Sequence, residues 1–380
     1  MSVFILYAIE ESIVKKTPLH DIHSKEGAIF DDYSGWMMPK RLGNGSEEYL
    51  AVRKNVGIVD LTHRGKLRLS GREHIKFLQG MLTNDINKLE EGNGLYATLL
   101  TVKGRTISDM VVYRDRESIL LDLEPGLNEK VREFLIKFRL SYRANIEDVT
   151  ENLGLISIHG PSSKRLLEKV VGEEIPELNQ YSFLDREING VQVRITRINR
   201  TGEDGYDIYT PSNTADMPWK YLAEHGEEFH LKQVGLDAME TLRIEAAIPR
   251  YGVDIDENTI PIEAGLWHAL SFEKGCYVGQ EVIARIKWRG HVNRHLVGFE
   301  LEGEDLPVSG DKINCNEREV GYITSSTFSP ALKKAIALGF IRREFIEPGT
   351  KVSIKTGDGK TLSGRVVETP FYRRSQLVIK

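Results

Sequence analysis

The chain has 380 residues, 40% hydrophobic and 28% charged, which is typical of an ordinary globular protein of two or three domains. Its 51 Lys and Arg residues against 56 Asp and Glu residues give a net charge of −5, so no overall positive field favours nucleic acid or anionic lipid as a partner. Two cysteines, Cys276 and Cys315, exclude a disulfide scaffold and a zinc site of several cysteines, and they indicate a reducing, cytoplasmic setting.

The N-terminal half predicts antiparallel sheets with helices packed on them. The apolar start, Met1–Ile9, is too short to span a membrane, and we expect an extra strand or a loose tail there. Ser46 can cap a helix that ends before Gly57, and Ser70 with Glu73 can form a capping box for the next helix. Further strands are expected at Gly65–Leu69, Tyr96–Val102, Thr106–Tyr113 and Ser118–Leu123, and an amphipathic helix carries Val131, Phe134, Leu135 and Phe138. This order favours the α+β class.

The second half continues this pattern and then changes. Strands are expected at Leu153–Ile158, Val191–Ile195 and Tyr206–Thr210, with helices after Pro161, over Leu236–Ala247 and over Gly279–Trp288. After His295 short strands alternate with glycine-containing turns, so the last ~90 residues predict a separate small β-barrel or sandwich.

Asp109 is the first candidate for chemistry. It lies within an apolar strand, and period-2 alternation puts it on one face with Ile107, Val111 and Tyr113. A carboxylate on an apolar face must find partners or shift its pKa upward, as an acid or base in a cleft does. The alternative is an edge strand whose Asp points to water.

Cys276 is the second candidate. It precedes an expected helix and follows Lys274 closely, and both features favour a thiolate, although a lone cysteine is more often a small buried apolar residue. The ten histidines form no H-x-x-x-H pair within an expected helix, so no metal site is expected.

Several motifs occur in an order that resembles the T protein (aminomethyltransferase) superfamily of the glycine cleavage system. They include G-W-M-M-P, L-T-N-D, P-I-E-A-G-L and S-S-T-F-S-P, at Gly35–Pro39, Leu82–Asp85, Pro261–Leu266 and Ser325–Pro330. Where T proteins usually read K-x-D-F-x-G-x-E, this chain has K-G-C-Y-V-G-Q-E at Lys274–Glu281, which resembles the YgfZ-type folate-binding proteins of iron–sulfur cluster assembly and repair.

The resemblance also assigns residues and shows departures. The catalytic Asp of T proteins maps onto Asp109, and the pterin-contacting Glu maps onto Asp207. A folate-side Tyr is replaced by Arg200 and an Arg of the folate site by Met239, which weakens the expected folate site, because losing a guanidinium there removes about 1.5–3 kcal/mol of charge-assisted hydrogen bonding.

The resemblance implies a T-protein cloverleaf: two interleaved lobes of antiparallel sheet and helix within residues 1–290, and a C-terminal β-barrel over residues 291–380, around a central folate channel. It implies tetrahydrofolate as cofactor, bound near Tyr96, Asp109, Tyr113 and Asp207, with Asp109 and Cys276 as catalytic residues.

The function that the resemblance favours is a YgfZ-like, one-carbon-linked role supporting iron–sulfur cluster assembly or repair, with iron–sulfur client or assembly proteins as partners. The alternative is an aminomethyltransferase, or a related methyltransferase or demethylase, with a lipoyl carrier protein as partner. A third reading is a folate-sensing scaffold in which Cys276 only packs.

Overall fold

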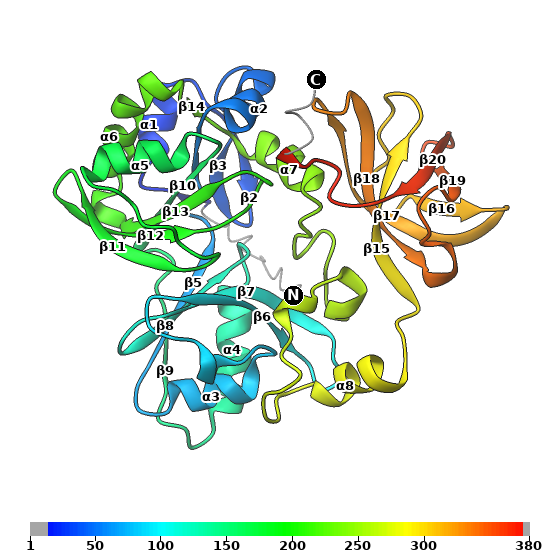
Figure 1. The fold of residues 1–380 in the computed structure, drawn as a ribbon, viewed down its shortest axis with the longest axis horizontal. Coiled ribbons are helices and arrows are strands. Elements are labelled where there is room, and N and C mark those ends of the chain that lie inside the picture. The colour runs from blue at the N-terminus through cyan, green and yellow to red at the C-terminus, as the bar shows by residue number, and fades with distance from the viewer. Residues whose placement is uncertain (1–13, 375–380) are drawn as a thin grey trace, which may run out of the picture.

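The computed structural model describes residues 14–374. The strand or tail expected at Met1–Ile9 therefore lies outside the described residues. Three bodies surround a common centre: two lobes of sheet and helix, and a barrel that is coloured yellow to red in Figure 1. Over the described range no helix is long and apolar enough to cross a bilayer.

The first lobe is built on a six-stranded sheet. In chain order its strands are β4 (Gly57–Asp60), β10 (Leu153–His159), β11 (Phe183–Ile188), β12 (Val191–Arg197), β13 (Gly205–Pro211) and β14 (Lys232–Gln233). They lie side by side in the order β11-β12-β13-β10-β4-β14, and only the β4–β14 pair is parallel. Helices α1 (His20–Lys25), α5 (Ser163–Val171) and α6 (Asp216–Gly226) pack on it, and Leu166 and Trp219 enter the same core as Ile156.

The second lobe is built on a five-stranded antiparallel sheet. Its strands are β5 (Gly65–Ser70), β6 (Gly94–Leu100), β7 (Thr106–Arg114), β8 (Ser118–Leu123) and β9 (Asn145–Asp148). Their spatial order is β6-β7-β8-β5-β9, which leaves β7 paired on both sides. Helices α3 (His74–Met81) and α4 (Asn128–Arg139) cover one face, where Phe77, Val131 and Leu135 meet Leu67 and Leu121.

The two lobes are interleaved along the chain. Strand β4 belongs to the first lobe, the next strand β5 begins the second, and the chain returns to the first lobe at β10. A shared apolar core joins the two sheets, where Val59 of β4 and Tyr209 of β13 pack with Tyr113 of β7. The expectation of two interleaved α+β lobes is confirmed.

Smaller elements close the centre. Strands β1 (Lys15–Lys16), β2 (Ile29–Tyr33) and β3 (Trp36–Arg41) form a three-stranded sheet, and helix α2 (Gly45–Lys54) packs against helix α7 (Leu236–Glu245). The chain then passes through an irregular segment, which contains two short 3-10 helices at Pro261–Ala264 and Trp267–Ala269 and helix α8 (Gln280–Arg289).

The C-terminal strands form a closed six-stranded barrel, as the short strands after His295 predicted. In chain order they are β15 (Arg294–Leu301), β16 (Lys312–Cys315), β17 (Arg318–Ser329), β18 (Lys334–Arg342), β19 (Lys351–Lys355) and β20 (Thr361–Val367), arranged β15-β18-β17-β16-β19-β20. The chain after the barrel returns to helices α2 and α7, where the guanidinium of Arg53 lies 3.7 Å from the ring centre of Tyr372 and the Tyr372 N–H donates to the carbonyl of Glu245.

Two expected helix starts are wrong in detail. The cap of α2 is Asn44, whose side chain accepts a hydrogen bond from the backbone N–H of Ser46. The capping box of Ser70 and Glu73 does not form, because Ser70 ends strand β5 and the Glu73 carboxylate accepts from the backbone N–H of Arg143 at 2.9 Å. Strand β6 also ends at Leu100, since Thr101 already belongs to the turn that leads to β7.

Candidate active site

A cavity of about 690 Å³ lies where the lobes and the irregular segment meet. Strands β6 and β7 contribute Tyr96, Asp109 and Val111 to its wall, and the loop before β13 contributes Arg200. Helix α7 and residues 247–253 and 264–268 contribute further parts of the wall. A volume within the range of ~300–1,000 Å³ is typical of pockets that bind small molecules and cofactors.

Asp109 presents a buried carboxylate to this cavity. Its side chain is on β7, between β6 and β8, so the alternative of an edge strand with Asp109 in water is wrong. The hydroxyl of Tyr96 donates a hydrogen bond to Oδ2 of Asp109. Oδ1 is buried and has no hydrogen-bond partner among the described residues. Because buried oxygens normally have a hydrogen-bond partner, this unpaired oxygen of a residue in the cavity wall is a candidate acceptor for a ligand.

The surroundings of Asp109 favour its protonated form. Burial, and to a smaller extent the negative charge of Glu124, raise the pKa of Asp109 to about 6, although the hydrogen bond from Tyr96 acts in the opposite direction. The pKa of Tyr96 lies well above its usual value because of burial and the neighbouring carboxylate, so its hydroxyl remains a donor. A carboxyl group with a pKa near neutrality can both accept and return a proton.

Aromatic rings line the cavity beside Asp109. The ring of Tyr96 is stacked with Tyr181, with the ring centres 6.3 Å apart and an angle of 20° between their planes. The ring of Tyr96 also lies 5.1 Å from that of His268, centre to centre, with an angle of 31° between their planes. Flat apolar surfaces next to one positioned carboxylate suit a planar heterocyclic ligand.

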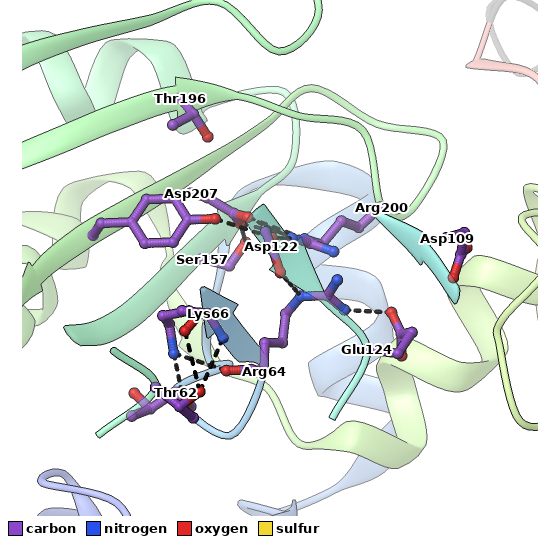
Figure 2. Close-up of polar contacts among 12 residues, drawn as sticks. Thr62, Arg64, Lys66, Asp109, Asp122, Glu124, Ser157, Thr196, Arg200 and Asp207 are labelled. Atoms are coloured by element: carbon purple, nitrogen blue, oxygen red, sulfur yellow. Dashed lines mark hydrogen bonds and ion pairs between the residues drawn. The ribbon is translucent and has the colours of Figure 1, made fainter. Parts of the chain in front are cut away.

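A buried network of charges, which the sequence analysis missed, contributes Arg64, Glu124 and Arg200 to the wall (Figure 2). Arg64 donates to Oδ1 of Asp122 at 2.7 Å and also to Glu124, while Arg200 donates to Oδ2 of Asp122 at 2.9 Å. Arg200 in addition donates to Oδ2 of Asp207 at 2.6 Å. Although burial alone would lower it, these carboxylates raise the pKa of Arg200 well above its usual value, so the guanidinium stays charged.

The structure places Tyr113 and Asp207 away from the cavity surface. Tyr113 is fully buried in the core between the two sheets, where its hydroxyl lies 3.3 Å from Oγ1 of Thr196. Asp207 is also fully buried, and its oxygens accept from Ser157 and Arg200. Neither is among the residues that line the cavity, because both side chains point into the packed interior.

Cys276 lies apart from Asp109. It is exposed, precedes α8 and does not line the cavity. The Lys274 ammonium, which was expected to favour a thiolate, donates instead to the backbone carbonyls of Leu82 and Asn84, at 2.7 Å each. Burial lowers the pKa of Lys274 to about 8. Within residues 14–374, no group of three His, Cys, Asp or Glu residues could hold a metal ion.

Comparisons with known proteins agree with this architecture. The model of the GCVT N-terminal domain matches residues 19–274, and that of the glycine cleavage T-protein C-terminal barrel domain matches residues 294–373. The aminomethyltransferase of Caldanaerobacter subterraneus subsp. tengcongensis is 34% identical over 95% of this chain and 97% of its own length. That of a Geobacillus species is also 34% identical, over 96% of this chain and 100% of its own. The crystal structure of glycine cleavage system aminomethyltransferase T from Bartonella henselae superposes with a TM-score of 0.86 at 26% identity, covering 95% of this chain and 99% of that one.

The fold and the matched relatives define a transferase-type enzyme. The chain belongs to the glycine cleavage T-protein family. The expected superfamily, fold class and enzyme character are thereby confirmed. The finer placement among YgfZ-type proteins receives no support, because the matched relatives are named aminomethyltransferase.

Proposed function

We propose that the protein is a tetrahydrofolate-dependent aminomethyltransferase, which takes an aminomethyl group from a lipoyl carrier protein. The observation that carries this proposal is the Asp109 carboxylate in the wall of a cavity of cofactor size, with Oδ2 held by Tyr96 and Oδ1 without a hydrogen-bond partner among the described residues. The names of relatives that match nearly the whole chain support the same reaction. The iron–sulfur role is therefore replaced by the alternative that the resemblance also offered.

The residues around the cavity fit a reduced folate. A pterin ring can pack against Tyr96, Tyr181 and His268, with one of its nitrogens facing the unpartnered oxygen of Asp109. Met239 removes a guanidinium that the T-protein pattern has, but Arg250 brings another to the same cavity, where it can meet a folate carboxylate. When bound, tetrahydrofolate supplies the nitrogen nucleophile that takes up the one-carbon unit, with the carrier sulfur left as a thiol and the amino group released as ammonia.

Asp109 holds or accepts a proton at Oδ1 in this proposal. Tyr96 fixes the other oxygen, so the carboxylate keeps one orientation. Burial excludes water from the carboxylate, which strengthens its interaction with a ligand N–H or with developing positive charge. These features let one residue orient the folate and transfer a proton.

A YgfZ-type role has one specific observation in its favour, the K-G-C-Y-V-G-Q-E string at Lys274–Glu281. In that role the Cys276 thiolate would be required. The transferase proposal makes no use of it, since Cys276 is exposed and lies outside the cavity wall.

Thermal unfolding with tetrahydrofolate tests the proposal. At a free concentration of 100 times Kd, a ligand that binds only the folded protein adds about 2.7 kcal/mol to its stability. We expect the wild type and Cys276→Ser to show the same rise in melting temperature, because the thiol lies away from the cavity, with Cys315→Ser as the matched control. No rise in melting temperature at millimolar tetrahydrofolate would contradict the proposal. A rise that is absent only in Cys276→Ser would show that the thiol takes part in folate binding.

A further inference from the structure

We propose that Glu124 is the carboxylate that receives the N–H groups of the bound ring, in the role that the resemblance gave to Asp207. This inference rests on the proposed function and adds a specificity-determining residue to it. Three features support it: both oxygens of Asp207 already accept hydrogen bonds, one oxygen of Glu124 has no partner among the described residues, and a series of ion pairs connects the two carboxylates (Figure 2).

Asp207 has little capacity left for a ligand. Its Oδ1 accepts from the hydroxyl of Ser157, and its Oδ2 accepts from Arg200 through Nη2 at 2.6 Å and Nε at 3.2 Å. The side chain is fully buried and does not line the cavity. A ring that reached Asp207 would have to displace Arg200, which would leave two buried carboxylates, Asp122 and Asp207, without this partner.

Glu124 has the capacity that Asp207 lacks. It directly follows strand β8 and lines the same cavity as Asp109. Its Oε1 accepts a hydrogen bond from Arg64, whereas its Oε2 has no partner among the described residues. The side chain is 21% exposed, so a ligand can reach this second oxygen.

The ion pairs fix Glu124 in this place. Asp207 holds Arg200, Arg200 and Arg64 share Asp122, and Arg64 in turn holds Glu124. Burial opposes ionisation of Glu124, but the charge and hydrogen bond of Arg64 outweigh it, and the pKa of Glu124 lies below its ordinary value. Asp207 therefore positions the network from its buried end, and Glu124 is the carboxylate of the network that a ligand can reach.

The chemistry of an ionised carboxylate defines what it recognises. It accepts hydrogen bonds only, so it selects a ligand edge that carries N–H donors. The amino group and ring N–H of a pterin form such an edge. The benzoylglutamate part of a folate instead ends in carboxylates, which Glu124 would repel.

The test separates these two parts of the ligand. We would titrate the full chain and its Glu124→Gln variant with tetrahydropterin, which lacks the tail, and with p-aminobenzoylglutamate, which lacks the ring. A charge-assisted hydrogen bond contributes about 1.5–3 kcal/mol, so we expect Glu124→Gln to bind tetrahydropterin about 10- to 100-fold more weakly. Its affinity for the tail fragment should not fall.

Asp207→Asn is the matched control, since it removes the other carboxylate of the network. We expect it to lower the melting temperature more than Glu124→Gln does, and to weaken tetrahydropterin binding less. Equal affinity of the wild type and Glu124→Gln for tetrahydropterin would overturn the assignment to Glu124 alone, as would a larger loss in Asp207→Asn. If the wild type binds neither tetrahydropterin nor tetrahydrofolate, the proposed function fails as well.

Discussion

Replacing Asp109 by Asn is expected to lower aminomethyl transfer by about 100- to 10,000-fold, which is the usual contribution of a positioned acid or base. Asn keeps the shape of the side chain and can still accept the hydrogen bond from Tyr96. The Asn side chain can neither take up and release a proton at the position of Oδ1 nor carry a negative charge. The measurement is the single-turnover rate at saturating tetrahydrofolate, with Asp305→Asn, at an exposed aspartate, as the control.

The pH dependence gives this variant a second readout. Because its pKa is raised to about 6, Asp109 loses its proton as the pH rises through that value, and kcat/KM of the wild type should rise with it. A carboxyl whose pKa is raised by folding favours the folded state below its unfolded pKa and loses that contribution as the pH rises through 6. Asp109→Asn should thus be at least as stable as the wild type at pH 8. An unchanged rate with the same pH profile would remove Asp109 from the mechanism.

Replacing Asp122 by Asn is expected to cause the largest loss of stability. Asp122 is fully buried and accepts from Arg64 at 2.7 Å, from Arg200 at 2.9 Å and from the hydroxyl of Tyr209 at 2.9 Å. Removing its charge leaves two buried guanidinium groups short of one partner, which typically costs about 3–5 kcal/mol. Urea unfolding at pH 7 measures this loss.

The pH dependence of stability, and a control variant at the exposed Asp305, make the Asp122 prediction specific. Burial opposes its ionisation, but Arg64 and Arg200 lower the pKa of Asp122, so its contribution is present above its unfolded pKa and is lost as the pH falls through the lower folded value. The difference between wild type and variant should shrink in strong acid. The ion pair of Asp305 with Lys360, 3.3 Å long and exposed, is worth at most about 1 kcal/mol. An Asp122→Asn protein no less stable than Asp305→Asn would show that the network does not stabilise the fold.

The position of Asp109 was predictable from local sequence. Apolar residues alternate around it over Thr106–Tyr113, and the structure has a strand at Thr106–Arg114. Alternation also put Tyr113 on the same face of the strand. It could not show that this face borders the cavity at Asp109 and the core between the sheets at Tyr113, four residues later. Burial along a strand depends on what packs against it, and that information is not local.

The charge network could not be predicted as a unit, because its members come from three separate segments of the chain. Arg64 precedes β5, Glu124 follows β8, and Arg200 precedes β13, so the sheets must form before these side chains meet. One signal was present: Asp122 interrupts the apolar strand Ser118–Leu123 just as Asp109 interrupts its own. The argument applied to Asp109 would have marked Asp122 as a buried charge that needs partners.

The most direct test follows the aminomethyl group itself. A lipoyl carrier protein loaded with an aminomethyl group is incubated with the full chain, with and without tetrahydrofolate, and its intact mass is recorded over time. The account predicts that the carrier loses the mass of the aminomethyl group only when both the protein and tetrahydrofolate are present. A carrier that keeps its mass with both present, under conditions in which tetrahydrofolate saturates the protein, would contradict it.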